Sequence, residues 1–182
     1  LNLLYDVLCI ILPWDNVDEE ETLSPRDWSG RTLGRFMLSF GPISSLFDIV
    51  TFLFLYYFLC PMLCGGATYL NLTDPALRLQ YVSFFQTGWF LESMWTQVLI
   101  LHFLRTRRIP FVQSRASVPV ICITLAGIVA FTAITFTEGA SLFGLTKLPL
   151  WYFVFLLIVA LLYMLLTTVV KTFYQKKYHE LI

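Results

Sequence analysis

Residues 149–170 read PLWYFVFLLIVALLYMLLTTVV, an apolar run without a charged side chain. About 20 consecutive apolar residues are enough for an α-helix to cross the hydrocarbon core of a bilayer. The rest of the chain has the same character, since 58% of its 182 residues are hydrophobic and 13% are charged, whereas about 25% of the residues in a soluble domain are charged. We therefore expect an all-α fold, a multi-pass transmembrane helical bundle.

Other apolar runs precede this one in the chain. Three are long enough to span a bilayer, and the predicted spans are residues 36–63, 81–104 and 118–136. The first run, residues 1–14, is shorter than the roughly 20 residues that a span needs, and the chain opens inside it at Leu1 without a Met. We interpret it as a truncated helix, so the bundle is expected to have one truncated and four full spans.

Positive charges are distributed unequally among the connecting segments. If these segments alternate between the two sides of a membrane, one side carries ten Lys and Arg residues and the other carries only Arg78 and Lys147. Because Lys and Arg are retained on the cytoplasmic side, the richer side is predicted to be cytoplasmic. The predicted segments are the cytoplasmic loops 15–35 and 105–117, the external loops 64–80 and 137–148, and the cytoplasmic tail 171–182.

Several function classes find no support in this chain. Twelve Lys and Arg balance twelve Asp and Glu, and no basic stripe interleaved with aromatic residues is present, so we expect no nucleic-acid partner. The nucleotide-binding, metalloprotease and hydrolase motifs are absent, so nothing in this chain hydrolyses ATP by itself. The basic cluster Arg105, Arg107 and Arg108 would lie at the level of lipid headgroups, which predicts contact with anionic lipids.

Three acidic residues fall inside apolar runs: Asp6, Asp48 and Glu92. An ionisable residue within a membrane is costly and tends to face a partner or a wet cavity. Asn2 and Asp6 are four residues apart and share a helix face, so that face offers oxygen ligands. Glu92 lies on the polar side of its helix and is a candidate ligand, because interhelical hydrogen bonding does not require an ionisable group.

The remaining polar residues of these runs have simpler interpretations. The Ser, Thr and Gln side chains beside Glu92 favour interhelical hydrogen bonds over metal ligation. Asp48 shares a face with Ser44 and Thr51, and a structural role is at least as well supported for it as an ion-binding role. His102 is interpreted as an interfacial histidine. The acidic residues of the first loop are interpreted as a solvated face, and they are Asp15, Asp18, Glu19, Glu20 and Glu21.

Several stretches together resemble a known family. Residues 2–6, NLLYD, look like the sixth membrane helix of P-type ATPases, where an Asn and an Asp four residues later line the transported-ion site. The later stretches resemble, in order, the C-terminal region of bacterial magnesium-transporting P-type ATPases. These stretches are LPWDNVDEE, PRDW, GRFM, GPISSLFD, FFQTGWFLES, HFLRTRRIPFVQS and LPLWYF.

The resemblance implies identities for the spans and a function for the whole protein. The five runs would be helices six to ten of a pump in the bacterial inner membrane that imports cations at the expense of ATP. Mg²⁺ would be the transported ion, with Asn2, Asp6 and Glu92 as metal ligands. The partners would be the first five helices and the cytoplasmic domains, which bind ATP and carry the phosphorylated Asp. Those domains are absent from this chain, and its residues alone do not distinguish Mg²⁺ from Ca²⁺ or protons.

Two other hypotheses belong to different classes. The first is that the chain is a stand-alone membrane scaffold or regulatory protein, or a pump remnant without ATPase activity. An intramembrane enzyme using Glu92 and His102 is the least favoured alternative, because ten residues along a helix correspond to about 15 Å. That separation is too large for one proton transfer between the two side chains.

Overall fold

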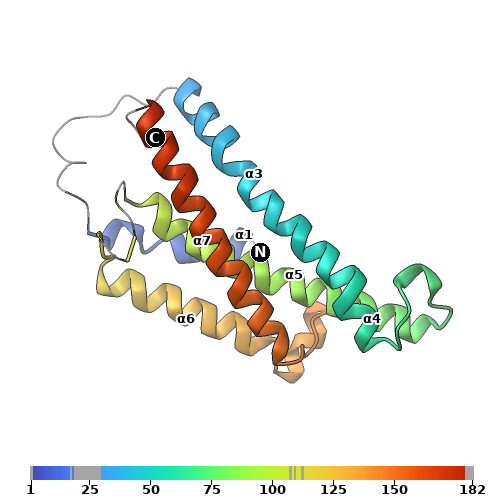
Figure 1. Ribbon diagram of the computed structural model, residues 1–182. Helices are drawn as coiled ribbons and strands as arrows, with labels where there is room; N and C mark the ends of the chain where they lie inside the picture. The colour runs from blue at the N-terminus through green and yellow to red at the C-terminus, as the bar shows by residue number, and fades with distance from the viewer. Residues whose placement is uncertain are drawn as a thin grey trace.

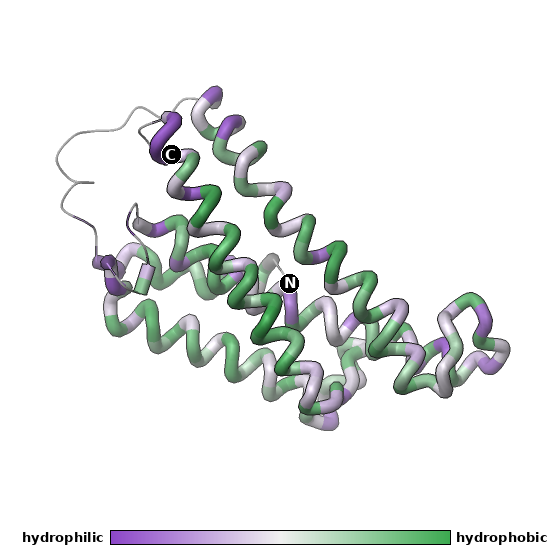
Figure 2. Tube along the Cα trace, viewed as in Figure 1, coloured by the Kyte–Doolittle hydropathy of each residue, from purple (hydrophilic) through white to green (hydrophobic). Residues whose placement is uncertain are grey.

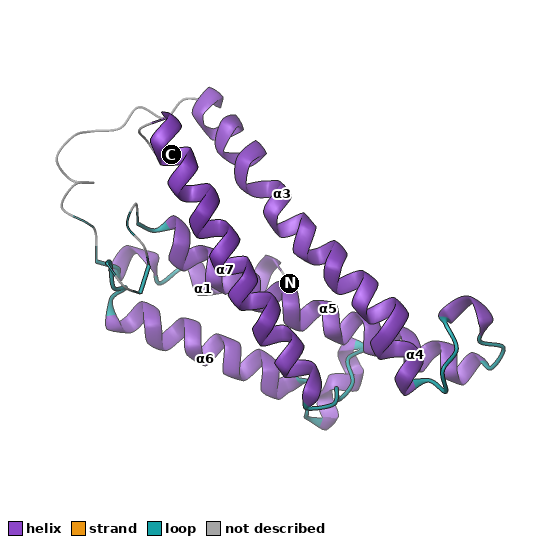
Figure 3. Ribbon diagram, in the orientation of Figure 1, coloured by secondary structure: helices purple, strands orange, loops and turns teal. Residues whose placement is uncertain are grey.

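The structure is a computed structural model that describes residues 2–16, 18, 30–106, 108, 110–111 and 113–178. Within these residues every element is helical (Figures 1 and 3), and the expected all-α fold is confirmed. In the described part of the chain, one isolated β-bridge joins Pro110 and Ser114 outside these helices. The elements are α1 Asn2–Cys9, η1 Leu12–Trp14, α3 Gly30–Phe54, η2 Leu55–Leu59, α4 Cys60–Leu63, η3 Tyr69–Asn71, α5 Pro75–Leu104, α6 Val118–Ile134, η4 Glu138–Phe143 and α7 Trp151–Tyr178.

Helix α5 is the centre of the bundle. It contacts α1, α3, α4, α6 and α7. In Figure 1, α3 and α7 run side by side and cross α5, whereas α6 lies on the other side of α7. A helix surrounded in this way can carry polar residues, because its neighbours rather than lipid cover them.

Three helices are longer than the apolar runs that predicted them. Helix α5 begins at Pro75, within the predicted external loop, because Asp74 caps it by accepting a hydrogen bond from the Ala76 backbone N–H at 2.9 Å. Such an N-cap and a Pro at the first helical position are strong start signals. Helix α3 begins at Gly30, before residue 36, and α7 continues past residue 170 to Tyr178. Apolar length therefore marks a possible lipid-facing segment and not the full helix.

A wider helical turn connects α3 to α4. Residues Leu55–Leu59 form a π-helical turn, and Pro61 follows directly in α4. Pro has no backbone N–H to donate to the preceding turn, and a π-turn is one way in which a helix accommodates such an interruption. The segment Gly30–Leu63 thus remains one continuous helix with a local irregularity.

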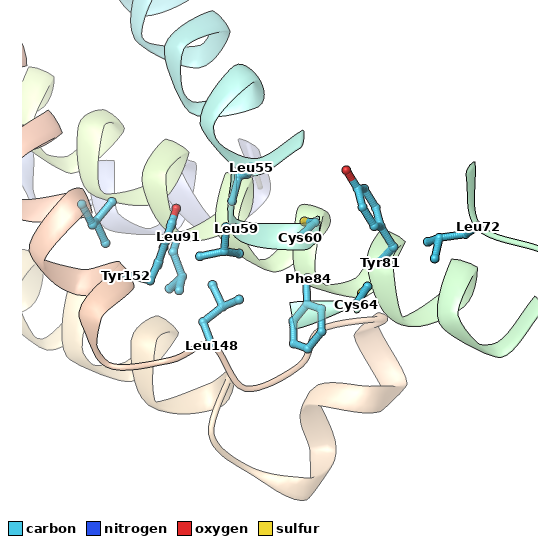
Figure 4. Close-up of a cluster of buried hydrophobic side chains, with 11 residues drawn as sticks. Leu55, Leu59, Cys60, Cys64, Leu72, Tyr81, Phe84, Leu91, Leu148 and Tyr152 are labelled. Atoms are coloured by element: carbon cyan, nitrogen blue, oxygen red, sulfur yellow. The ribbon is translucent and has the colours of Figure 1, made fainter. Parts of the chain in front are cut away.

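Gly88 is the point where three elements meet. A Cβ atom at Gly88 would lie 2.5 Å from Leu55 Cδ2, so η2 approaches the α5 backbone more closely than a larger residue would allow. On the α7 side, the Tyr152 hydroxyl donates a hydrogen bond to the Gly88 carbonyl oxygen at 2.7 Å. Figure 4 shows the buried cluster around this crossing, in which Leu55, Leu59, Leu91, Leu148 and Tyr152 converge.

The surface of the bundle is apolar over long stretches. On α7, Leu157, Leu161 and Leu165 follow one another at helical spacing and are exposed. Figure 2 shows that hydrophobic residues cover much of α3, α6 and α7, whereas polar residues gather at helix ends and connections. Exposed apolar surface of this extent is rare on a soluble monomer and typical of an interaction or membrane surface.

Among the residues that the structure describes, two helical segments are long and apolar enough to cross a membrane, Gly30–Leu63 and Trp151–Tyr178. Helix α6 is apolar but has only 17 residues. Helix α5 has sufficient length, with 30 residues, but polar side chains interrupt its apolar character. The expectation of one truncated and four full spans is therefore met by length and composition for two spans, and the complete set of five remains a prediction.

Candidate cation-binding site

Glu92 is buried at the centre of the bundle. Its position on α5 is one turn beyond the Gly88 crossing, and its side chain is 1% exposed. Its Oε2 atom is buried and has no hydrogen-bond partner in the structure. A buried polar atom without a partner costs about 1–3 kcal/mol, and more when the group is charged. This oxygen therefore calls for a functional explanation.

The nearest acidic neighbour of Glu92 is Asp48 of α3. The two carboxyl groups interact across the α3–α5 interface. Asp48 Oδ1 also accepts a hydrogen bond from the Trp89 indole N–H at 3.1 Å. The sequence left the role of Asp48 open between a structural and an ion-binding one, and the structure brings it to Glu92. The sequence did contain one signal for this contact. Asp48 and Glu92 each lie near the middle of an apolar run, and the two runs are consecutive in the chain.

Hydroxyl groups surround this carboxyl pair. Thr51 lies three residues after Asp48, on the same face of α3, and its Oγ1 atom is buried without a hydrogen-bond partner. The Tyr163 hydroxyl of α7 lies 3.2 Å from Ser44 Oγ and interacts electrostatically with both carboxyl groups. Helices α3, α5 and α7 thus bring oxygen atoms together in one buried region.

The polar side chains near Glu92 are satisfied mainly within their own helix. Thr96 Oγ1 donates to the Glu92 and Ser93 carbonyl oxygens, at distances of 3.0 and 3.1 Å. Thr87 Oγ1 donates to the Ser83 carbonyl oxygen but also accepts a hydrogen bond from the Thr146 backbone N–H. Thr96 therefore bonds to the backbone of its own helix rather than across helices as expected, and Thr87 links α5 to the loop that precedes α7.

Asp6, the acidic residue of α1, does not lie on the face of α1 that packs against α6. Leu8 is buried, and its Cδ2 atom lies 2.9 Å from where a Cβ of Gly127 would be, so this side of α1 packs tightly against α6. Asp6 is exposed. At about 100° per residue, Asp6 and Leu8 lie on opposite faces of the helix. The Asn2 side chain lies outside the described part of the chain.

The described contacts therefore place Asp6 and Glu92, two of the three predicted metal ligands, on different surfaces. Glu92 faces Asp48, and Asp6 points away from the helices that α1 packs against. Among the described residues, no cluster of three or more His, Cys, Asp or Glu side chains is suited to hold a metal ion.

Comparison with known proteins identifies the chain. Residues 1–173 match the family model described as "Cation transporting ATPase, C-terminus". The chain belongs to this family. The expected resemblance to helices six to ten of a P-type pump is thereby confirmed as homology to the C-terminal region of these ATPases.

Relatives of this cation-transporting ATPase domain are named "Magnesium-transporting ATPase, P-type 1". One from Salmonella typhimurium strain 14028s is 42% identical over 177 residues, which cover 97% of this chain. The protein of that name from Escherichia coli strain K12 is 41% identical over 177 residues, and another from Salmonella typhimurium strain LT2 is 38% identical over 179 residues. The chain spans 18% of the length of each of these relatives. This homology does not favour the stand-alone scaffold hypothesis.

A polar junction lies at one end of this C-terminal domain. We use this term for the side chains of Asp15, Asp18, Arg105, Thr106, Ser114 and Lys171. Arg105 forms an ion pair with Asp15, with 2.8 Å between Nη1 and Oδ2, and the two side chains are 4% and 8% exposed. Asp15 Oδ1 also accepts a hydrogen bond from the Ser117 backbone N–H at 2.8 Å. The segment after α1 is thereby held to the connection between α5 and α6.

Asp18 belongs to the same junction. Its carboxylate accepts hydrogen bonds from the hydroxyls of Thr106 and Ser114. Burial raises the pKa of Asp18, but these hydrogen bonds and the charges of Arg108 and Arg105 outweigh burial and lower the pKa below its usual value. The prediction that Asp15 and Asp18 belong to a solvated acidic face is therefore wrong, and the predicted Glu19, Glu20 and Glu21 lie outside the described residues.

Lys171 completes the junction from α7. Its side chain is 3% exposed, and its ammonium group donates to the carbonyl oxygens of Phe103, Thr106 and Arg108 at 2.8, 2.5 and 2.9 Å. The last carbonyl groups of a helix have no partner within it, and a Lys side chain can supply one. The residue predicted to begin a cytoplasmic tail instead caps the end of α5.

The structure also changes the interpretation of Arg105 and His102. Because Arg105 is buried against Asp15, its guanidinium is not available to lipid headgroups, which corrects the prediction for this residue. Arg107 lies outside the described residues, and Arg108 is exposed. His102 was expected at the interface but is buried, with Nε2 3.1 Å from Thr124 Oγ1 of α6. It therefore links α5 to α6.

Proposed function

We propose that this chain is the C-terminal transport module of a P-type pump that imports Mg²⁺ with energy from ATP. The observation that carries the proposal is Glu92, a buried acid with an unpartnered oxygen on the central helix of a cation-transporting ATPase domain. Relatives over nearly the whole chain are named magnesium-transporting ATPases. The module supplies part of an ion path through the membrane.

The proposed ion path includes Asn2 and Asp6 from α1 and Glu92 from α5. Asp6 supports this proposal because it is exposed although it lies in an apolar helix. Its open surface is available to another part of the whole protein. That part comprises the first five helices and the cytoplasmic domains, where ATP binds and phosphorylation takes place.

Mg²⁺ agrees with the chemistry of these side chains. It is a hard cation that prefers oxygen ligands, keeps several waters and is held by one or two carboxylates. Asp6 and Glu92 supply carboxylates, and Asn2 supplies an amide oxygen. The set contains none of the thiolate or imidazole ligands that favour softer metals.

We further propose that the module lies in the bacterial inner membrane with its C-terminus in the cytoplasm. Ten positive charges against two support this orientation. Burial of α5 among its neighbours supports counting it as a span despite its polar residues. The proposed lipid contacts are with the exposed apolar helix faces and, for anionic headgroups, with the basic segment that includes Arg108.

The proposal is tested by replacing Asp6 in the intact pump. Asp6→Asn removes the charge and keeps the shape, so Mg²⁺-dependent ATPase activity of the purified protein in proteoliposomes should fall at least tenfold. The matched control is Asp74→Asn, an exposed acid at the start of α5, which should leave the activity close to wild type. Unchanged magnesium dependence of the Asp6→Asn protein would rule out Asp6 as a ligand.

A further inference from the structure

The buried Glu92 interacts with the half-buried Asp48 across the α3–α5 interface, and no cation among the described residues acts on Glu92. Among the described residues, the only charged group that acts on Glu92 is Asp48. The other titratable neighbours are Tyr152 and Tyr163 of α7, which are neutral phenols at physiological pH. Two close carboxylates in a medium of low dielectric repel each other strongly. An ionised pair therefore requires a bound positive charge.

The register of α3 and α5 extends this region to Thr51. The two segments are antiparallel, because Phe85 stacks on Phe52 and Trp89, further along α5, bonds to Asp48, earlier in α3. Leu55 contacts Gly88 at the crossing. One turn from that contact along each helix, Thr51 and Glu92 lie at the same level.

Two buried oxygen atoms in this region have no hydrogen-bond partner. Glu92 Oε2 and Thr51 Oγ1 are both buried without a partner, although buried polar groups in proteins are nearly always hydrogen-bonded. A structural carboxyl pair would be expected to satisfy its neighbouring hydroxyl. The same orphaned oxygens are suitable ligands for a hard cation.

We infer that Asp48 and Glu92, with Thr51, form a divalent-cation site between α3 and α5. This inference rests on the proposed transport function and adds α3 to the ion path. Two carboxylates carry a charge of −2, which a divalent cation neutralises, whereas a monovalent cation would leave an uncompensated buried charge. Mg²⁺ fits this ligand set because it is held by one or two carboxylates and completes its coordination with waters.

The test measures Mg²⁺ binding to the intact purified pump by isothermal titration calorimetry, without nucleotide. Asp48→Asn and Glu92→Gln should each weaken the binding at least tenfold. The double variant should be little weaker than either single variant, because both changes remove the same site. Asp74→Asn is the matched control and should bind Mg²⁺ as the wild type does.

Trp89 provides a second readout at the site itself. Its indole N–H bonds to Asp48, so Mg²⁺ binding should change the tryptophan fluorescence. Trp89→Phe should lose most of this fluorescence change while calorimetry still detects binding. Thr51→Val preserves side-chain shape, so it provides a test even if the acidic variants fail to fold. It should weaken Mg²⁺ binding several-fold without lowering the thermal unfolding temperature in Mg²⁺-free buffer.

The outcomes separate this inference from the proposed function. If Asp48→Asn, Glu92→Gln and Thr51→Val bind Mg²⁺ as tightly as the wild type while Asp6→Asn loses activity, the inference is wrong and the transport proposal stands. If the acidic variants alter only the pH dependence of activity, the pair holds a proton and the cation site is likewise refuted. If Asp6→Asn is also without effect, both proposals fail.

Discussion

At the scale of single residues, Gly88 determines how closely η2 can approach α5. Glycine is needed here because of space, since a Cβ atom would lie 2.5 and 2.9 Å from the two methyl carbons of Leu55. Glu92 is one helical turn away, so the position of its carboxyl group relative to α3 depends on this contact. The small residue thus sets the geometry of the proposed cation site.

Replacing Gly88 by Ala should therefore destabilise the bundle. Overpacking a close contact typically costs about 1–3 kcal/mol, and we expect a lower thermal unfolding temperature and weaker Mg²⁺ binding. Gly34→Ala is the control, because no atom lies within 4 Å of a Cβ at that position. Leu55→Ala should destabilise the Gly88→Ala protein less than it destabilises the wild type, because in that background it also relieves the close contact. A Gly88→Ala protein as stable as the wild type would show that Leu55 moves aside freely.

Sequence analysis found Glu92 and failed to find its partner. A helical period shows which residues share a face, but it does not show which neighbouring helix covers that face. Asp48 was therefore assigned from its own helix alone. The ion pair of Asp15 with Arg105 joins residues 90 positions apart, and a single sequence contains no signal for such a pairing. Both contacts depend on tertiary packing.

At the scale of elements, apolar runs predicted where helices exist better than where they end. Helix α6, Val118–Ile134, agrees closely with the predicted run 118–136. Helix α5 starts six residues earlier than predicted because an Asp cap and a Pro begin it at residue 75. Helix α7 continues to Tyr178 because Lys171 and Tyr174 remain buried beyond the apolar run. Capping and tertiary contacts, rather than hydropathy, set these ends.

The cap that Lys171 provides to α5 can be tested directly. Lys171→Met keeps the length of the side chain and removes all three hydrogen bonds, leaving the carbonyl oxygens of Phe103, Thr106 and Arg108 without this donor. Loss of such bonds should lower the free energy of unfolding by about 1–3 kcal/mol. Faster amide hydrogen exchange near residues 103–106 should accompany it.

Lys176 is the matched control for this change. It lies on the same helix but is exposed, so Lys176→Met should leave both stability and exchange near the wild-type values. Equal behaviour of the two variants would mean that the ammonium group of Lys171 contributes no net stability where it is buried.

At the scale of the whole molecule, the proposed five spans include α5, which length and hydropathy together do not identify as a span. Its polar residues lower its apolar character, yet α3, α6 and α7 pack around it. In the proposed arrangement, the outer helices contact lipid, and two segments of the described chain that include such helices are apolar enough to cross a membrane. Hydropathy therefore detects helices that face lipid more readily than a helix enclosed by others.

The proposed orientation predicts which residues each side of the membrane can reach. In a variant without the four native cysteines, a cysteine replacing Thr73 should react with an impermeant maleimide in cells whose inner membrane is intact. A cysteine replacing Lys176 should react only after that membrane is opened. Both positions are exposed in the structure, so burial does not explain a difference. The reverse pattern of labelling would show that the proposed orientation is wrong and that the C-terminus faces the other side of the membrane.

The polar junction has a mechanical consequence for α1. Asp15 and Asp18 fasten the chain just after this helix to the connection between α5 and α6. While those bonds hold, α1 can be displaced mainly by tilting about its fastened end. The displacement is then largest near Asn2 and becomes smaller toward Asp15, where the junction holds the chain.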